Sequence, residues 1–515
     1  MSVIKAAGSG LGGKGDPGGA LGSFYSHTID QSLRFEDGDS AHLYKTWGVA
    51  ADSNKIYTFS CWFKRSALGN SGIVNFVSSI NTGSGTEQGS NHYGFYNNDT
   101  LWYATENGGE NAISKRLIRD SSAWYHITYQ YDTTQSTATD RLKIYLNGVN
   151  IPQGTENWLT AGFGFPETPA LNSVMTSMNQ NGRLNAIGAG IAGSVNRYYF
   201  DGYLAEIIML DGVTADCTAF GEFKDGVWIP KEYSGSFGTN GYHLDFADSS
   251  AIGNDVSGNN NDWSVYGLAA TDVVLDSPTN NFATMNPLYN SSLQATLLEG
   301  NLKVDGAGFN NSAYNYGAVS TFAIPKDKKI YIEIECTDGT GDNWYAGFAT
   351  QSGLESGTSS TNVGGASAVT LYNRAVFKNG TQFQYSSSDG LGGLGGGTSP
   401  LAAGDILGMA VDGSNGKVWF HKNGTYWKTI SGNNGSVGNT GNPSAGSDEL
   451  ATIDNVPAED LFVVIGGNSS ASAIFVNFGQ DSTNVASANS DSEGIGTFEY
   501  AVPTGYYTLC TKNLG

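Results

Sequence analysis

GDILGMAVDGSNGKVWFHKNGTYW, residues 404–427, is the stretch that decides the fold of the second half of the chain. Apolar residues alternate with other residues on both sides of the polar cluster at 412–416. This alternation predicts two half-buried strands, and the Asp, Asn and Gly of the cluster supply the positive φ angles of a hairpin turn. Asn423 and Gly424 predict a second turn. We therefore expect antiparallel strands joined by tight turns.

The composition extends this expectation to the whole chain. The 515 residues include 71 Gly, 27 Tyr and only 14% charged residues. Such values favour short strands and many turns over helices, and the length allows two to four domains. The predicted fold class is all-β, with two antiparallel, jelly-roll-like β-sandwiches in tandem. Strong strand patterns in the first half lie at 57–65, 123–132 and 141–151, and a short helix is expected at 214–223 with Thr214 as its N-cap.

The formal net charge of −22 argues against nucleic acid and anionic membranes as direct partners, because both would repel the chain. The four cysteines form no CxxC pair, so neither zinc nor a disulfide framework is predicted. No apolar run approaches the roughly 20 residues of a membrane span, and the first residues lack the apolar core of a signal peptide. We expect synthesis in a cytoplasm, with any outward display depending on assembly into a particle.

Three motifs in the second half resemble the SPRY domain, a β-sandwich used for recognition. They are the hairpin at 404–427, IYIEIECTDGTGDNWYAGFAT at 330–350, and LFVVIGGNSSASAIFVNFGQ at 461–480. Together they cover about residues 282–515. The resemblance implies a fold more firmly than a function.

The first half resembles laminin G-like and concanavalin A-like lectin sandwiches. The resemblance rests on W-Y-H-I at 124–127, Y-x-N-G at 145–148 and FDGYLAEIIMLDG from Phe200 onward. YHLDFADSSAIGNDVSGNNNDW at 242–263 resembles the stretch that usually opens such a domain, yet it comes late. Either the sandwich is permuted, with this strand beside residues 32–35, or a small subdomain starts there; permutation is favoured.

These patterns predict four segments. A glycine-rich N-terminal arm spans 1–22, a laminin G/concanavalin A-like sandwich 23–265, an extended connector 266–290, and a SPRY-like sandwich 291–515. The arm cannot bury enough surface to fold alone. It is either a loose terminus or a segment that becomes ordered against a neighbouring subunit.

No catalytic constellation stands out in the sequence. The six histidines show no HExxH or HxH spacing, and His126 and His421 are expected to be packed strand residues. Glu333 and Glu335 alternate on one strand face and have a spacing that a glycosidase carboxylate pair could use, although a structural role is favoured. G-x-S-x-G and Walker A motifs are absent from the sequence. We therefore predict a protein that is not an enzyme.

The expected sites are for binding. Hard oxygen donors in one loop make calcium the only cofactor worth naming, with a solvated turn as the alternative; they are Asp255, Asn259, Asn261 and Asp262. Aromatic residues in or near predicted loops are candidates for contact with a sugar or a protein; they are Trp102, Trp158, Trp344, Tyr372 and Trp427.

The combination of a glycine-rich start, S-L-R-F-x-D-x-D-S-A-x-L from 32, D-S-P-T-N-N-F-A-T-x-N-P-L from 276 and a SPRY-like end resembles virion surface proteins of tailed phages, particularly those of marine hosts. The resemblance implies a fibre, adhesin or head decoration on the virion surface, bound to other virion proteins through its N-terminal arm. It also implies several copies, most simply a homotrimer, and recognition of a host-surface glycan or protein. The alternatives are a polysaccharide depolymerase and a purely structural capsid cement.

Overall fold

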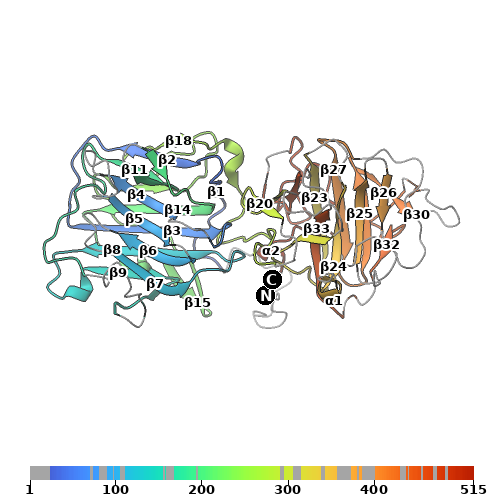
Figure 1. Ribbon diagram of the computed structural model, residues 1–515, viewed down its shortest axis with the longest axis horizontal. Coiled ribbons are helices and arrows are strands. Elements are labelled where there is room, and N and C mark those ends of the chain that lie inside the picture. Colours follow the sequence, from blue (N-terminus) through green and yellow to red (C-terminus); the bar gives the residue numbers. More distant parts are fainter. Residues whose placement is uncertain are drawn as a thin grey trace. The chain divides into compact units, whose positions relative to one another are not determined.

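A computed structural model describes the protein at residues 24–69, 74–80, 90–96, 98–104, 111–154, 157, 168–192, 195–289, 295–305, 315–337, 343–356, 373–379, 382–385, 401–429, 437–438, 440–453, 456, 458–467, 473–481 and 485–514. These residues are nearly all β, and the α-helices among them are α1 (Gln351–Ser356) and α2 (Thr511–Leu514). No helix in these ranges is long and apolar enough to cross a membrane. The described chain divides into two compact units, with the boundary between Asn281 and Phe282 (Figure 1).

The first unit is a sandwich of two antiparallel sheets. The first sheet, called the β14 sheet after its central strand, has the order β10 (Val149–Asn150), β9 (Leu142–Leu146), β8 (Tyr125–Asp132), β3 (Ile56–Arg65), β14 (Gly202–Asp211), β1 (Ser32–Phe35) and β19 (Val273–Val274), with β17 (Tyr242–Leu244) also on β14. The β4 sheet has the order β18 (Ser264–Tyr266), β2 (His42–Thr46), β11 (Leu184–Ile187), β4 (Val74–Ile80), β5 (Ser90–Tyr96), β6 (Thr100–Ala104) and β7 (Asn111–Leu117). Two hairpins accompany them, β12 (Gly190–Ala192) with β13 (Val195–Arg197) and β15 (Gly221–Lys224) with β16 (Val227–Pro230).

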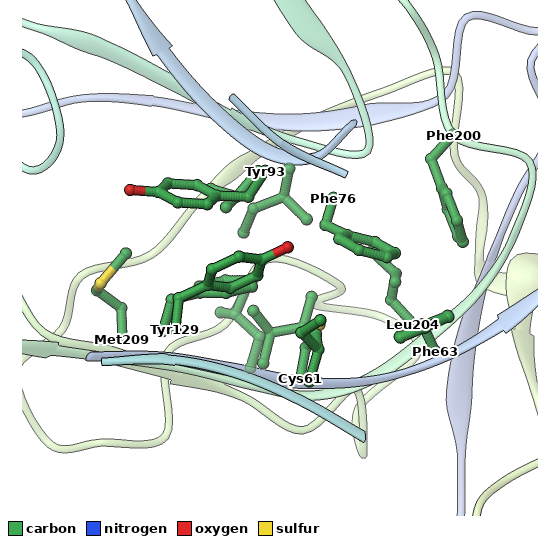
Figure 2. Packing of buried hydrophobic residues seen from close by; sticks show 14 of the residues in the cluster. Cys61, Phe63, Phe76, Tyr93, Tyr129, Phe200, Leu204 and Met209 are labelled. Atoms are coloured by element: carbon green, nitrogen blue, oxygen red, sulfur yellow. The ribbon is translucent and has the colours of Figure 1, made fainter. Parts of the chain in front are cut away.

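The core of this sandwich follows from the two-residue period of its strands. Phe59, Cys61 and Phe63 of β3 point inward, as do Tyr93 and Phe95 of β5, and all five are fully or almost fully buried. Figure 2 shows Cys61, Phe63 and Tyr93 in this core, together with Phe76 and Tyr129. The residues that alternate with them on each strand face outward, and the candidate sites lie on these outer faces.

The second unit is also a sandwich. The β23 sheet has the order β20 (Thr296–Leu298), β21 (Lys303–Asp305), β34 (Ala473–Asn477), β23 (Lys329–Cys336), β27 (Ile406–Asp412), β28 (Lys417–Lys422) and β29 (Thr425–Tyr426), with β32 (Ala451–Thr452) on β28. The β33 sheet has the order β22 (Asn315–Val319), β33 (Leu461–Gly467), β24 (Asn343–Thr350), β25 (Asn373–Asn379) and β26 (Gln382–Tyr385). A small pair, β30 (Lys428–Thr429) and β31 (Val437–Gly438), completes the described strands.

The hairpin predicted at 404–427 is confirmed. β27 pairs with β28 from Leu407 opposite Lys422 to Val411 opposite Val418. Gly416 adopts a φ of 71°, and the second predicted turn has Asn423 at 48° and Gly424 at 81°. The turn residues therefore supply the left-handed conformations that the sequence pattern required.

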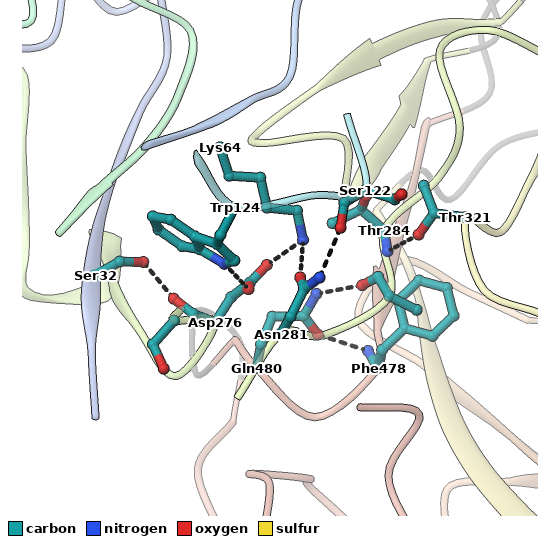
Figure 3. A network of polar contacts seen from close by, with 12 residues as sticks. Ser32, Lys64, Ser122, Trp124, Asp276, Asn281, Thr284, Thr321, Phe478 and Gln480 are labelled. Carbon is teal, nitrogen blue, oxygen red and sulfur yellow. Dashed lines mark hydrogen bonds and ion pairs between the residues drawn. The ribbon is translucent and has the colours of Figure 1, made fainter. Parts of the chain in front are cut away.

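The predicted connector, 266–290, is divided between the two units. In the first unit, β19 pairs with β1, and the Lys64 ammonium lies 2.7 Å from the Asp276 carboxylate, with both side chains at most 1% exposed. Lys64 also donates to Asn281 at 2.8 Å, and the Trp124 indole donates to Asp276 at 2.9 Å (Figure 3). The DSPTNN turn is thus built into the sandwich through a buried charge pair.

After Phe282 the chain belongs to the second unit. The Gln480 amide donates to the carbonyl of Ala283 at 2.8 Å, and the backbone N–H of Thr284 donates to Thr321 Oγ1 at 3.0 Å (Figure 3). The ATMNP part of the motif therefore has its partners in the second sandwich, and both halves of the stretch are specified by buried polar contacts.

Two local predictions are corrected by the structure. Tyr242–Leu244 does not pair with residues 32–35 and does not start a subdomain. It pairs with Ile207–Met209 of β14, while β1 pairs with Gly202–Leu204 of the same strand. The helix expected at 214–223 is a single 3₁₀ turn at Cys217–Ala219, capped by Asp216 rather than Thr214, because the chain enters the β15–β16 hairpin directly afterwards.

Candidate functional site

The structure places the predicted aromatic site residues in different environments. Trp344 and Trp427 are 2% and 3% exposed and belong to the core of the second sandwich, so the structure corrects their assignment to binding loops. Trp102 points outward from β6 but is only 8% exposed, because it stacks on His92 at a centroid distance of 5.4 Å and packs on neighbouring apolar side chains. Trp158 and Tyr372 lie outside the described residues.

The predicted calcium residues do lie in one loop, but their polar atoms bind the protein itself. The Asp255 carboxylate accepts hydrogen bonds from the backbone N–H groups of His243, Ser257 and Asn261, at 2.8–2.9 Å. The side-chain amides of Asn259 and Asn261 both donate to the carbonyl of Gly241. Asp262 accepts from the backbone of Asp255. This arrangement is that of a self-supporting Asx turn, and it gives no support to a calcium site.

One group of carboxylates that the sequence did not single out has the spacing of metal ligands. Within the ranges that the structure describes, it is formed by Glu36, Asp37 and Asp201, whose oxygens lie within 4.8 Å of one another. Glu36 and Asp201 are buried and Asp37 is exposed. Acidic groups of this kind are common without an ion, so we assign none to it.

Glu333 and Glu335 line a pocket on the outer face of the β23 sheet. The pocket holds about 280 Å³ of empty space, partly open to solvent. Asp481 and Glu499 add two further carboxylates, and Ile406, Phe475, Asn477 and Val485 complete the lining. The structure therefore does bring the predicted carboxylate pair together at one cavity.

The bonds of Glu333 show what this carboxylate does. Its oxygens accept hydrogen bonds from the backbone N–H groups of Glu499 at 2.7 Å and Tyr500 at 2.8 Å, and from the Tyr331 hydroxyl at 2.8 Å. The side chain is 3% exposed. Burial raises the pKa of Glu333 to about 7 despite these donors. The principal role seen is to fasten the C-terminal segment over the outer face of the sheet.

Behind Glu333, a fixed chain of bonds leads to His421. The Gly424 N–H donates to His421 Nδ1 at 3.1 Å, so the ring proton is on Nε2 and is donated to the Tyr331 hydroxyl at 2.7 Å. Burial lowers the pKa of His421 to about 3, which keeps the ring neutral. Only glycine fits opposite this ring, since a Cβ at Gly408 would occupy the place of the imidazole. This histidine supports Tyr331 and has no free basic nitrogen for a substrate.

On the first sandwich, the outer face of the β14 sheet also carries a carboxylate, that of Glu206. Glu206 lies at a β-bulge in β14, with a φ of 47° that is strained for a residue other than glycine. His243 Nε2 lies 2.8 Å from one carboxylate oxygen and His27 Nε2 lies 3.3 Å from the other. Burial alone would raise the pKa of Glu206, but the two imidazoles lower it to about 2. The carboxylate in turn raises the pKa of both histidines.

Glu206 and His27 line a small pocket with about 210 Å³ of empty space. The remaining lining is mainly apolar and comprises Ile29, Ser60, Trp62, His126, Ile208, Phe220, Pro230 and Lys231. His27, which lies shortly after the predicted N-terminal arm, thus contributes to the lining of this pocket.

Ser60 and His126, which both line this pocket, are hydrogen-bonded to each other, but the direction of the bond is wrong for nucleophilic catalysis. The Trp228 indole N–H donates to His126 Nδ1 at 3.1 Å, so the ring proton lies on Nε2 and points to Ser60 Oγ at 2.8 Å. His126 therefore donates to Ser60 and cannot take its proton. Burial lowers the pKa of His126 to about 3, consistent with a neutral ring.

Sequence reasoning found Glu333 and Glu335 as a pair but not the Glu206 cluster. The partners of Glu206 come from positions 27 and 243, far away in the sequence. The acidic residue inside the apolar run YLAEIIML was the available signal, because a charge in a central strand needs a partner.

Comparison with known proteins identifies the fold of the first unit. Residues 37–214 match the family described as the concanavalin A-like lectin/glucanases superfamily. No curated protein sequence matches the chain. The family match thus assigns the first unit, a sandwich of two antiparallel sheets, to the laminin G/concanavalin A-like type.

Several solved structures are similar to parts of this chain. They include a heptameric SAP-like pentraxin from Limulus polyphemus (16% identity, 36% of this chain and 78% of that chain, TM-score 0.25) and the CBM40 of a Ruminococcus gnavus IT-sialidase (13% identity, 37% and 96%, TM-score 0.22). Domains LG4-5 of the mouse laminin α1 chain match at 11% identity over 87% of this chain and 88% of that chain, with a TM-score of 0.27. At such scores these likenesses carry no argument about function.

Proposed function

We propose that this protein recognises saccharides through its first sandwich and performs no catalytic step of its own. The family that matches residues 37–214 includes lectins in its description, which supports binding of a sugar. The observation that carries the proposal is the direction of the hydrogen bonds at His126, which lines the pocket beside Glu206, and at His421, which lies behind Glu333. His126 and His421 keep their protons on Nε2 for internal partners, so neither ring acts as a base toward a ligand.

The biological setting that we propose is the surface of a tailed-phage virion. The support comes from the sequence: the glycine-rich start, the SLRF and DSPTNNF stretches and the SPRY-like second half. The N-terminal arm would bind other virion proteins, and several copies, most simply three, would carry the sandwiches. Weak single sites would then act together, because linked sites bind with far greater avidity than one.

Immunogold electron microscopy tests the setting. Antibody raised against residues 282–515 is applied to intact particles from the source, with antibody to an unrelated cytoplasmic protein as the control. Gold on the tail supports host recognition, and gold over the head supports decoration. Particles without gold at either place would contradict a virion role.

One observation favours a second candidate function, a polysaccharide depolymerase. Glu333, with its pKa of about 7, lines one cavity together with Glu335, and a glycosidase needs a protonated carboxyl group near an ionised one. Glu333→Gln removes the proton source. If the chain degrades host polysaccharide and this variant does not, the protein is a depolymerase, and the proposal of recognition without catalysis is wrong.

A further inference from the structure

An aromatic surface lies on the outer face of the β4 sheet, on the side of the first sandwich away from Glu206. Tyr266 of the edge strand β18 stands directly opposite His42 of β2, and Ser264 stands opposite Tyr44. Residues that face each other across an antiparallel pair point to the same side of the sheet. Leu43, between His42 and Tyr44, is fully buried in the core, so its two neighbours point outward.

The rings in this surface form a connected group around a buried centre. The His42 ring centroid lies 5.1 Å from that of Tyr266, 5.8 Å from that of Tyr44 and 6.0 Å from that of Tyr199. His42 itself is 3% exposed and is fixed by a 2.7 Å hydrogen bond between Nδ1 and the carbonyl of Ser40. Tyr266 is 58% exposed and Tyr44 39% exposed. We call these four residues the Tyr44–Tyr266 strip.

The strip carries no formal charge, although the chain has a net charge of −22. Burial lowers the pKa of His42, which keeps its ring neutral. The outward neighbours on β2, β18 and β11 are Thr46, Ser264 and Ala186, as the strand registers show. Among these described residues, the strip and its three outward neighbours thus offer aromatic faces and hydroxyl groups and carry no charged side chain.

We propose that the Tyr44–Tyr266 strip is a binding surface for a neutral saccharide chain. The proposal rests on the proposed function and names its site and ligand class. Aromatic rings stack on the C–H faces of sugar rings, and the phenol hydroxyls at their rims can exchange hydrogen bonds with sugar hydroxyls. An uncharged surface is complementary to an uncharged ligand, whereas a charged glycan would gain no ion pair there.

The test measures binding of the full chain to immobilised cellohexaose, maltohexaose and galactotetraose, with sialyllactose and oligogalacturonate as acidic probes. The variants are Tyr44→Ala/Tyr266→Ala, the single Tyr266→Ala, and Tyr44→Phe/Tyr266→Phe, which keeps the rings. Phe223→Ala is the matched control, because Phe223 is a 57% exposed aromatic ring on the β15 hairpin. Unfolding midpoints verify that each variant is folded.

We expect a neutral probe to bind, and the double alanine variant to bind it at least about tenfold more weakly, since two ring contacts are worth roughly 1.4 kcal/mol or more together. The phenylalanine variant and Phe223→Ala should stay within about threefold of the parent, and affinity should change little with salt. Should the double variant fail to fold, a loss in Tyr266→Ala supports the strip and an unchanged affinity overturns it.

The remaining outcomes separate the two proposals. If a neutral probe binds the double alanine variant with the same affinity as the parent, the strip is overturned and saccharide recognition by the first sandwich still stands. Binding of acidic probes alone also overturns the strip. If no probe binds, both the strip and the proposed function fail.

Discussion

Glu206 and Glu333 occupy comparable positions in the two sandwiches, yet their pKa values are shifted in opposite directions. Each is a mostly buried carboxylate on the outward side of a central strand, and each fastens a distant segment of its own unit. The pKa of Glu206 is lowered to about 2 and that of Glu333 is raised to about 7. Similar burial therefore has different consequences, depending on the groups that surround the carboxylate.

The difference lies in whether the partners can carry a charge. Glu206 is paired with two imidazoles, which become cations and neutralise it. Glu333 is paired with two backbone N–H groups and a phenol, which donate hydrogen bonds but stay neutral. At Glu333 the hydrogen bonds do not offset the cost of removing the charge from water, whereas at Glu206 the two imidazoles do.

A third carboxylate extends the comparison to an ammonium partner and gives the largest expected effect. Asp276 is fully buried against the Lys64 ammonium. Lys64→Ala should lower the unfolding free energy of the first unit by about 3–5 kcal/mol, because an uncompensated charge stays buried. Urea unfolding of the full chain measures this. Lys143→Ala, which removes a half-exposed pair with Asp140, is the control and should cost less than about 1 kcal/mol.

Glu333 should make the second unit less stable as the pH rises. Its pKa is higher in the folded state than the ordinary 4.5, so the folded state binds the proton more tightly. The stabilisation is full below pH 4.5 and is lost as the pH rises through about 7, by about 3 kcal/mol as an upper value. Glu333→Gln should flatten this slope, whereas Glu335→Gln should keep it. An unchanged slope in Glu333→Gln would show that another group titrates.

The Glu206 cluster should be most stable in a window of mildly acidic pH. The lowered pKa of Glu206 gives stability above about 4.5 that is lost as the pH falls toward 2. The raised pKa values of His27 and His243 give stability below 6.5 that is lost as the pH rises through their folded values. Thermal unfolding of the first unit should therefore peak between these limits.

Replacing Glu206 should remove the stability maximum at mildly acidic pH. Glu206→Gln is expected to cost about 1–3 kcal/mol near pH 5.5, since two charge-assisted hydrogen bonds are lost. Glu222→Gln, which affects only the exposed contact with Ser26, is the matched control. A pH profile of Glu206→Gln that keeps its maximum would contradict the assignment of the window to this cluster.

The smallest effect is expected from Tyr331→Phe. The substitution removes the phenol that lies between His421 and Glu333, and it should cost about 0.5–1.5 kcal/mol. Because Glu333 loses a donor to its charged form, its pKa should move further upward. Titration of the carboxyl by NMR in the parent and the variant measures the shift. A downward shift would contradict donation of this hydrogen bond from the phenol to the carboxylate.

The strand patterns were predictable because they are local. The β27–β28 hairpin follows from alternation and turn residues within residues 404–427, and the structure confirms it. The helix expected at 214–223 failed because hairpin pairing of Gly221–Lys224 with Val227–Pro230 competes with helix formation over the same residues. Local conformational preference therefore determines the structure of residues 404–427, whereas strand pairing determines that of residues 214–223.

The sites were harder to predict because their residues meet only in the folded chain. His42 and Tyr266 come from opposite ends of the first sandwich's sequence, and they are brought together by the pairing of β2 with the edge strand β18. Exposed tryptophans were expected in loops, but Trp344 and Trp427 are core residues because large aromatic rings are favourable to bury. The exposed aromatic rings are instead Tyr266 on the edge strand β18 and Tyr44 on the neighbouring strand β2.

Incubation of the full chain with labelled oligosaccharides, followed by mass spectrometry of bound and free sugar, tests recognition without catalysis most directly. The account predicts that a neutral oligosaccharide is retained by the protein and recovered intact, and that Glu333→Gln retains it equally well. Shortened products that form with the parent chain and disappear with Glu333→Gln would contradict the account and establish a hydrolase.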